Sequence, residues 1–255
     1  VAGAAVATVS AQLVVMLVMM VGVFRSKKEE NVLKGIRLFE PFSKEELGNI
    51  CKIGGPTAIQ GMVYCMISMV LTRMVAAFGA EAIATQRVGG QIESVSWNTA
   101  DGFAAALNAF VGQNYGAKKM DRVQEGYRIS FWTVAIWGAL IMLAFIIFPG
   151  PIAGVFFHEE KAMEIAISYL IIIGFSEAFM CVELMTIGAL SGLGKTKLCS
   201  VISITATSMR IPLAMVLSRT SLGLDGIWWA MSLTSVVKGI IFTIVFHRIT
   251  HNGRS

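Results

Sequence analysis

The sequence has little charge for its length. Asp, Glu, Lys and Arg together make up 15% of its 255 residues, whereas soluble domains carry about 25%. Apolar residues account for 55%, and the mean hydropathy is +0.70. A soluble chain of this size still has to cover its core with polar surface. The composition therefore excludes an ordinary soluble domain and indicates a membrane protein.

The sequence also lacks the common motifs of catalysis and metal binding. The four cysteines lie singly, without CxxC or CxxH spacing, which argues against a disulfide framework or a metal site. There is no Walker A motif, no arrangement of Ser, His and Asp, and no TVGYG-like filter. Basic residues fall between apolar stretches, not along one patch, so the net charge of +5 does not indicate nucleic acid. We expect a protein that is not an enzyme and holds neither a cofactor nor a metal.

What the sequence does contain is a series of long apolar segments. A membrane-spanning helix needs about 20 mostly apolar residues. The segments are too long and alternate too little for barrel strands, so we predict an all-α polytopic membrane protein with seven transmembrane helices. The predicted spans are residues 1–24, 48–77, 84–113, 127–157, 162–190, 199–218 and 226–247. Because the chain starts at Val1, inside an apolar run, we expect it to be a fragment of a longer protein.

Basic residues near the ends of these spans predict their orientation. Cytoplasmic loops of membrane proteins are enriched in Lys and Arg. The connection after the first span, and every second connection after that, carries most of the basic residues, whereas the opposite side has Arg73, Lys161 and Arg219. The alternation holds through all seven spans. It places Val1 outside and Ser255 in the cytoplasm, with residues 25–47 as a cytoplasmic linker.

The third predicted span is the richest in polar side chains. At about 100° per residue, two carboxylates, an indole and several amides fall on one face of this helix. Such groups are costly in hydrocarbon, so this face lines a helix interface or a water-filled cavity, and we favour the cavity because the two acids have no basic residue beside them. The residues of this polar stripe are Gln86, Gly90, Glu93, Ser94, Trp97, Asp101 and Asn108.

Other spans add candidates for the same cavity. Gln60 and Tyr64 share one face of the second span. In the fifth span Glu177 and Glu183 lie about 120° apart around the helix, so both cannot sit at the centre of one face, and we favour Glu183. Arg210 in the sixth span either neutralises one of these acids or extends to the membrane interface.

The fifth span ends in a GxxxG pattern at residues 188–192. Small residues four positions apart let two helix backbones approach closely. We therefore expect a close helix contact at this point.

Several short runs, in this order and at this spacing, resemble the multidrug and toxic compound extrusion (MATE) family. The resemblance covers nearly the whole chain, and it rests on the combination of the runs, since no single one is specific. The runs are IGGPTAIQ at 53–60, FGAEAIA at 78–84, QIES at 91–94, VGQNYGA at 111–117, GALSGLGKT at 188–196, RIP at 210–212 and LGLDGIWW at 222–229.

The resemblance implies an architecture for the complete protein. Members of the family have twelve helices in two six-helix lobes that are related by a pseudo-twofold axis and joined by a cytoplasmic linker. On this basis residues 1–24 are the last helix of a truncated N-terminal lobe, residues 25–47 are the inter-lobe linker, and residues 48–250 form the C-terminal six-helix lobe. The missing N-terminal lobe and the lipid bilayer are the expected partners.

The resemblance also implies a function. Family members export cationic or amphipathic drugs and metabolites in exchange for H+ or Na+, by alternating access. Tyr64 stands where some sodium-coupled members have an acid, and Glu183 lies one turn from the other expected acid, so either ion remains open as the coupling ion. The implied location is the plasma (inner) membrane of a bacterium, with the C-terminus in the cytoplasm.

The candidate cavity leaves two other functions open. A lipid-linked or polysaccharide flippase of the same superfamily should have a more basic cavity, against which the acids argue. A non-transporting membrane scaffold or assembly partner would use the polar stripe as an interface, and Glu93→Gln or Asp101→Asn would then leave transport intact. The expected substrate and ion cavity consists of Gln60, Tyr64, Glu93, Trp97, Asp101, Asn108 and Glu183.

Overall fold

The computed structural model describes residues 2–25 and 43–252, and these residues are almost entirely α-helical. They divide into two compact units, Val1–Gly48 and Asn49–Ser255. The helices are α1 (Ala2–Arg25), α2 (Lys44–Ala76), α3 (Ala80–Gly116), α4 (Met120–Ile147), α5 (Pro149–Gly154), α6 (Glu160–Gly192), α7 (Thr196–Ser208), α8 (Arg210–Leu217) and α9 (Leu224–Asn252). The predicted linker lies mostly outside the described residues, although Arg25 ends α1 and Lys44 begins α2.

All seven predicted spans are helical, and two of them are interrupted. The fourth divides into α4 and α5 at Phe148, and Pro149 begins the new helix. Proline is well suited to the first position of a helix, because its φ is already helical and the N–H that it lacks would have no partner there. The sixth divides into α7 and α8 at Met209. Pro212 lies one turn beyond this break and cannot donate the helical hydrogen bond back toward α7.

Length and composition identify a multi-pass membrane protein. Within the described residues, six helical segments are long and apolar enough to cross a membrane: α1, α2, α4, α6, α7 together with α8, and α9. The exception among the seven predicted spans is α3, which carries Glu81, Arg87, Glu93 and Asp101. A helix with this many charges must turn them toward protein or water, not toward lipid.

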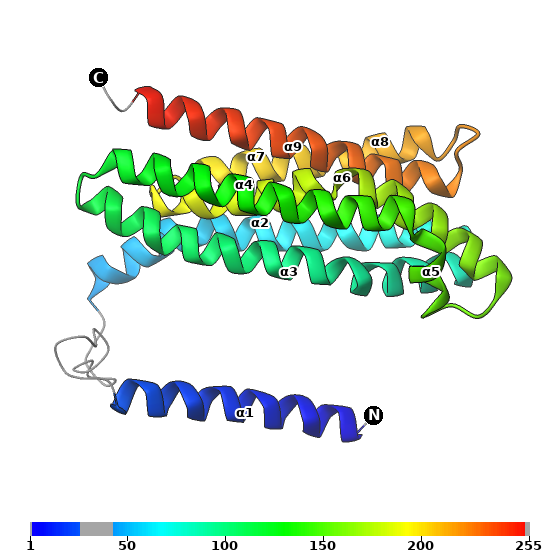
Figure 1. Cartoon of the computed structure of the whole chain (residues 1–255), viewed down its shortest axis with the longest axis horizontal. Coiled ribbons are helices and arrows are strands. Elements are labelled where there is room, and N and C mark those ends of the chain that lie inside the picture. Colours follow the sequence, from blue (N-terminus) through cyan, green and yellow to red (C-terminus); the bar gives the residue numbers. More distant parts are fainter. Residues whose placement is uncertain (1, 26–42, 253–255) are drawn as a thin grey trace. The chain divides into compact units, whose positions relative to one another are not determined.

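Helix α6 lies inside the second unit, where α3, α4 and α9 pack along it (Figure 1). Its buried residues occur around much of its circumference, in keeping with a helix that is apolar on nearly all sides. A Cβ atom at Gly192 would lie 2.6 Å from the carbonyl oxygen of Asn108 in α3, and one at Gly188 would meet the backbone of Ala104. The close helix contact predicted from the GxxxG pattern is therefore confirmed.

Glycines of two neighbouring helices make equally close contacts with α6. A Cβ atom at Gly138 of α4 would lie 2.7 Å from the Cα atom of Ala178, and one at Gly239 of α9 would lie 2.7 Å from the carbonyl oxygen of Phe179. Backbone therefore meets backbone at both interfaces. These contacts set how far α4 and α9 stand from α6.

Helix α2 is packed on only part of its length. Ile67, Leu71 and Val75 join a core cluster with residues of α8 and α9, including Ala214 and Ile227. The first half of α2 is largely exposed within this unit. Just before this packed part, Gln60 and Tyr64 of α2 face a space that α3, α6, α8 and α9 also line.

We expect Gly192→Ala to destabilise the protein. The added methyl group would be forced against the α3 backbone, and overpacking of this kind costs about 1–3 kcal/mol. Thermal unfolding of the purified protein in a mild detergent measures the effect. Gly102→Ala is the control, because no heavy atom lies within 4 Å of a Cβ built there. Equal melting temperatures for the two variants would contradict the close contact.

Candidate functional site

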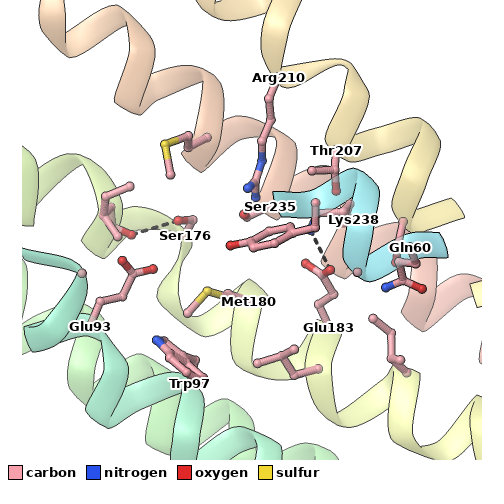
Figure 2. A pocket seen from close by; sticks show the side chains of 18 of the residues that line it. Gln60, Glu93, Trp97, Ser176, Met180, Glu183, Thr207, Arg210, Ser235 and Lys238 are labelled. Atoms are coloured by element: carbon pink, nitrogen blue, oxygen red, sulfur yellow. Dashed lines mark hydrogen bonds and ion pairs between the residues drawn. The ribbon is translucent and has the colours of Figure 1, made fainter. Parts of the chain in front are cut away.

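A cavity of about 550 Å³ lies in the second unit, with walls from α2, α3, α6, α7, α8 and α9 (Figure 2). Its volume is within the range of pockets that hold drug-sized molecules, about 300–1,000 Å³. The residues that line it are Gln60, Gly61, Val63, Tyr64, Gln86, Gly90, Glu93, Trp97, Tyr169, Ile173, Ser176, Met180, Glu183, Leu184, Ile187, Ser203, Ile204, Thr207, Arg210, Met231, Ser235 and Lys238.

The structure brings together most of the residues predicted from the sequence. Gln60, Tyr64, Glu93, Trp97 and Glu183 all line the cavity. Their side chains come from three helices, and Figure 2 shows Glu93 and Trp97 on one side of the space and Glu183 and Gln60 on the other.

Asp101 and Asn108, in contrast, do not line this cavity, and their part in a substrate or ion pathway stays a prediction. Both side chains are exposed within this unit. At a rise of 1.5 Å per residue they lie about 12 Å and about 22 Å beyond Glu93 along α3. The polar stripe is therefore longer than the cavity, and only its first half faces it.

Lys238 is the main residue that the sequence analysis missed. Its Nζ atom donates to Oε1 of Glu183 at 2.7 Å, and both side chains are more than nine-tenths buried. This ion pair joins α6 to α9 across the cavity wall. A lysine inside the otherwise apolar segment 226–247 was the available signal, because an isolated ammonium is costly in a membrane-spanning helix and needs a partner.

Arg210 fits neither of the two roles expected for it. It is 7% exposed and lines the cavity, so it does not extend to the membrane interface. Its Nε atom donates to Oγ1 of Thr234 at 2.9 Å and an Nη atom donates to Oγ of Ser235 at 2.9 Å. Of the two acids that it was expected to neutralise, Glu183 is paired with Lys238 instead, and no ion pair joins Arg210 to Glu177 in the part of the chain that the structure describes.

A second group of polar residues lies between α3 and α6. The Tyr169 hydroxyl donates to Oε2 of Glu93 at 3.2 Å. Glu177 is fully buried, and within the described residues neither of its carboxylate oxygens has a hydrogen-bond partner of good geometry, although the Ser96 hydroxyl is near. Glu177 is close enough to Glu93 for their charges to interact.

The ionisable residues of the cavity wall therefore have both signs. Glu93 and Glu183 are acidic, whereas Arg210 and Lys238 are basic. The cavity residues predicted from the sequence include the two acids and neither of the two cations. The reason is that both cations come from helices other than α3, so the pattern on α3 alone could not show them.

Comparison with known proteins agrees with the all-helical membrane architecture. A family model for MatE matches residues 56–216, which is more than half of the chain. This chain belongs to the MatE family. The resemblance seen in the sequence is thereby confirmed, and because the family consists of secondary transporters, so is the expectation that the protein is not an enzyme.

Curated relatives of this MatE chain are about twice as long. It is 28% identical to a probable multidrug resistance protein NorM of Thermotoga maritima over 250 residues, which are 96% of this chain and 52% of that protein. It is 27% identical to a probable multidrug resistance protein YoeA of Bacillus subtilis, over 89% of this chain and 49% of the relative. The chain thus spans about half the length of the curated relatives that it matches.

Solved structures show the same fold. The bent form of the Vibrio cholerae MATE transporter VcmN matches 84% of this MatE chain and 49% of its own, with a TM-score of 0.76 and 19% identity. A transporter of the MOP superfamily from Pyrococcus furiosus matches 86% of this chain and 50% of its own, with a TM-score of 0.77 and 20% identity. The predicted all-α transporter architecture is confirmed.

We expect Lys238→Met to destabilise the protein strongly, because it leaves the Glu183 carboxylate buried without its partner. Breaking a buried ion pair in this way costs about 3–5 kcal/mol, whereas replacing both partners costs much less. The free energy of unfolding should therefore recover largely in the double variant Glu183→Gln/Lys238→Met. Denaturation of the purified protein in detergent measures all three.

The exposed ion pair of Lys161 with Glu81, at 3.4 Å, supplies the control. Lys161→Met should change stability little, since exposed pairs contribute little. A double variant no more stable than Lys238→Met would show that the two residues do not act as a pair.

Proposed function

We propose that this chain is part of an antiporter that uses H+ or Na+ to export cationic or amphipathic drugs or metabolites by alternating access. The observation that carries the proposal is the drug-sized cavity inside a membrane-spanning bundle, with the half-buried carboxyl group of Glu93 on α3 and two buried carboxyl groups on α6 beside it. Ionisable residues at membrane depth typically belong to substrate or ion pathways.

The names of the relatives support this substrate class. The matched proteins include two probable multidrug resistance proteins and the multidrug export protein MepA of Staphylococcus aureus, which is 22% identical over 89% of this chain. We propose that a second, N-terminal lobe completes the transporter and supplies the opposite wall of the pathway. The two lobes would rock against each other to expose the cavity alternately to each side of the membrane.

For coupling, we propose that the ion binds at Glu93 and Glu177. Glu93 faces the cavity and therefore the substrate, while Glu177 lies behind it without a geometric hydrogen-bond partner in the described structure. A proton or Na+ on this pair would reduce the charge that Glu93 presents to a cationic substrate. Ion and substrate would thus compete for one carboxylate, which is what exchange requires.

The flippase alternative gains support from the basic residues of the cavity. Arg210 and Lys238 are the kind of groups that hold an anionic headgroup. In the Pyrococcus furiosus transporter, a binding pocket of reversed polarity suggests a different function. We still favour the antiporter, since Lys238 is already paired with Glu183 and Glu93 would repel a phosphate. In the third alternative, a scaffold without transport, the cavity residues would have no role in export.

We further propose that the protein lies in the plasma (inner) membrane of a bacterium with its C-terminus in the cytoplasm. The matched relatives named above are bacterial. The alternation of basic residues supports the orientation.

Transport by the full-length protein in proteoliposomes tests the proposal. We expect an imposed pH gradient or Na+ gradient to drive export of the cationic dye ethidium. Glu93→Gln and Glu177→Gln should each reduce the gradient-driven rate about ten-fold or more, because each removes a carboxylate from the coupling site. Glu164→Gln, an exposed position near the start of the same helix α6, should not.

Two results would contradict the antiporter. One is that neither gradient drives export of ethidium by the wild-type protein. The other is that Glu93→Gln and Glu177→Gln both transport at the wild-type rate, as the scaffold alternative requires.

A further inference from the structure

A further pocket, of about 290 Å³, lies between α4 and α9. Both helices pack along α6, and the start of α4 and the end of α9 lie at the same end of the second unit (Figure 1). The pocket shares no lining residue with the large cavity described above. It is therefore a separate feature of the fold, to which the proposed transport cycle assigns no role.

Contacts between the helices hold the walls of this pocket in place. The rings of Tyr127 and Phe246 stack with their centroids 3.7 Å apart, which joins α4 to α9. The Tyr127 hydroxyl is hydrogen-bonded to Oγ1 of Thr186 in α6 at 3.0 Å. Nε2 of Gln124 donates to the carbonyl oxygen of Thr250 at 3.1 Å, which joins α4 to α9 a second time. The pocket is thus formed by fixed contacts with three helices.

The inner part of the pocket is aromatic and its rim is basic. Phe246 is buried and Tyr127 half-buried, whereas Arg128 of α4 and His247 of α9 are exposed. Within the described residues, no carboxylate makes an ion pair with Arg128. A basic rim of this kind favours an anionic ligand.

The whole end of the unit around this pocket is positively charged. Residues 117–130, 193–200 and 247–252 contain the connections before α4 and α7 and the end of α9. They carry seven Lys or Arg residues but only two acids, Asp121 and Glu125. An anion that approaches this end is therefore attracted before it reaches the pocket.

The pocket also lies at the depth of lipid headgroups. Arg128 and His247 stand at the ends of the predicted spans 127–157 and 226–247. Beyond Arg128, the exposed face of α4 is apolar and begins with Ile129, Trp132 and Ile136. Tryptophan is enriched at this level of membrane proteins, where its ring meets both headgroups and hydrocarbon. A ligand on the basic rim therefore has an apolar surface beside it.

We propose that this pocket binds the headgroup of an anionic phospholipid. The phosphate lies on Arg128 beside His247, and the acyl chains follow the apolar face of α4. A guanidinium suits this role because its N–H donors form charge-assisted hydrogen bonds with phosphate oxygens. Basic pockets between transmembrane helices hold anionic headgroups in the same way. The bound lipid bridges α4 and α9 at the edge of the membrane.

Two lipids with the same chains test this inference without a variant. Dioleoyl phosphatidylglycerol is anionic, whereas the choline of dioleoyl phosphatidylcholine adds a cation that Arg128 would repel. Native mass spectrometry of the full-length protein in a neutral detergent counts the bound lipids and gives their Kd. We expect phosphatidylglycerol to bind about five-fold more tightly, the effect of one basic residue at an anionic headgroup. Equal affinities, or tighter binding of phosphatidylcholine, would overturn the inference.

Two arginine variants locate the site. Arg128→Gln should lose one tightly bound phosphatidylglycerol per protein, and unchanged binding of phosphatidylcholine would report that the variant is folded. Arg122→Gln is the matched control, because it removes the same charge from the same end of α4. Arg122 is exposed, lies about 120° around the helix from Arg128 and does not line the pocket. Equal loss in both variants, or no loss in Arg128→Gln, would overturn the inference.

Inorganic phosphate distinguishes a lipid from a soluble anion. Added in excess over the lipid, it should leave phosphatidylglycerol bound, because it lacks the acyl chains that contact α4. Displacement of the lipid by phosphate from wild-type protein, but not from Arg128→Gln, would overturn the lipid assignment in favour of a soluble anion. None of these measurements uses an ion gradient, so their outcome is independent of the proposed antiport.

Discussion

The packing of α6 against its neighbours is the constraint on which the cavity depends. Glycines at Gly138, Gly188, Gly192 and Gly239 bring three helices to backbone contact with α6, so their positions are set by main-chain atoms and not by adaptable side chains. Tyr169, Ser176 and Glu183 lie on one face of α6 and line the cavity. The backbone contacts fix the position of this face relative to α3 and α9. Helix α2 lacks such contacts over its first half. The cavity therefore has one rigid wall, on α6, and one wall that is packed over only part of its length.

Within that frame, the charges of the cavity divide into a paired and an unpaired set. The ion pair of Glu183 with Lys238 is nearly fully buried and stabilises the contact between α6 and α9. In the part of the chain that the structure describes, the side chains of Glu93 and Arg210 hydrogen-bond to hydroxyl groups, on opposite sides of the same space. Pairing of the first two residues is what leaves the other two free for a ligand. Coupling through Glu93 and Glu177, as proposed, would place the ion at a residue that also faces the substrate cavity.

Much of the fold could be predicted from the sequence because long apolar runs and basic loops reflect the bilayer directly. The polar face of α3 could also be predicted, because helical periodicity places Glu93 and Trp97 on one side of the helix. The extent of this face along the cavity could not be predicted, because the last residue of α3 that lines the cavity is Trp97, and the exposed Asp101 and Asn108 lie beyond it. The role of Lys238 depends on the rotation of α9 relative to α6. No local pattern in either helix encodes that angle.

Protection of a cysteine inside the cavity would test most directly whether substrates bind there. In a full-length protein whose native cysteines, including the four of this chain, are replaced by serine, Met180→Cys places a thiol in the wall of the cavity. Ser221→Cys places one in the exposed connection before α9. If the cavity is the binding site, saturating ethidium should slow maleimide labelling of the cysteine at position 180 and leave labelling at position 221 unchanged. Equal labelling rates at position 180 with and without the dye would contradict a binding site in this cavity.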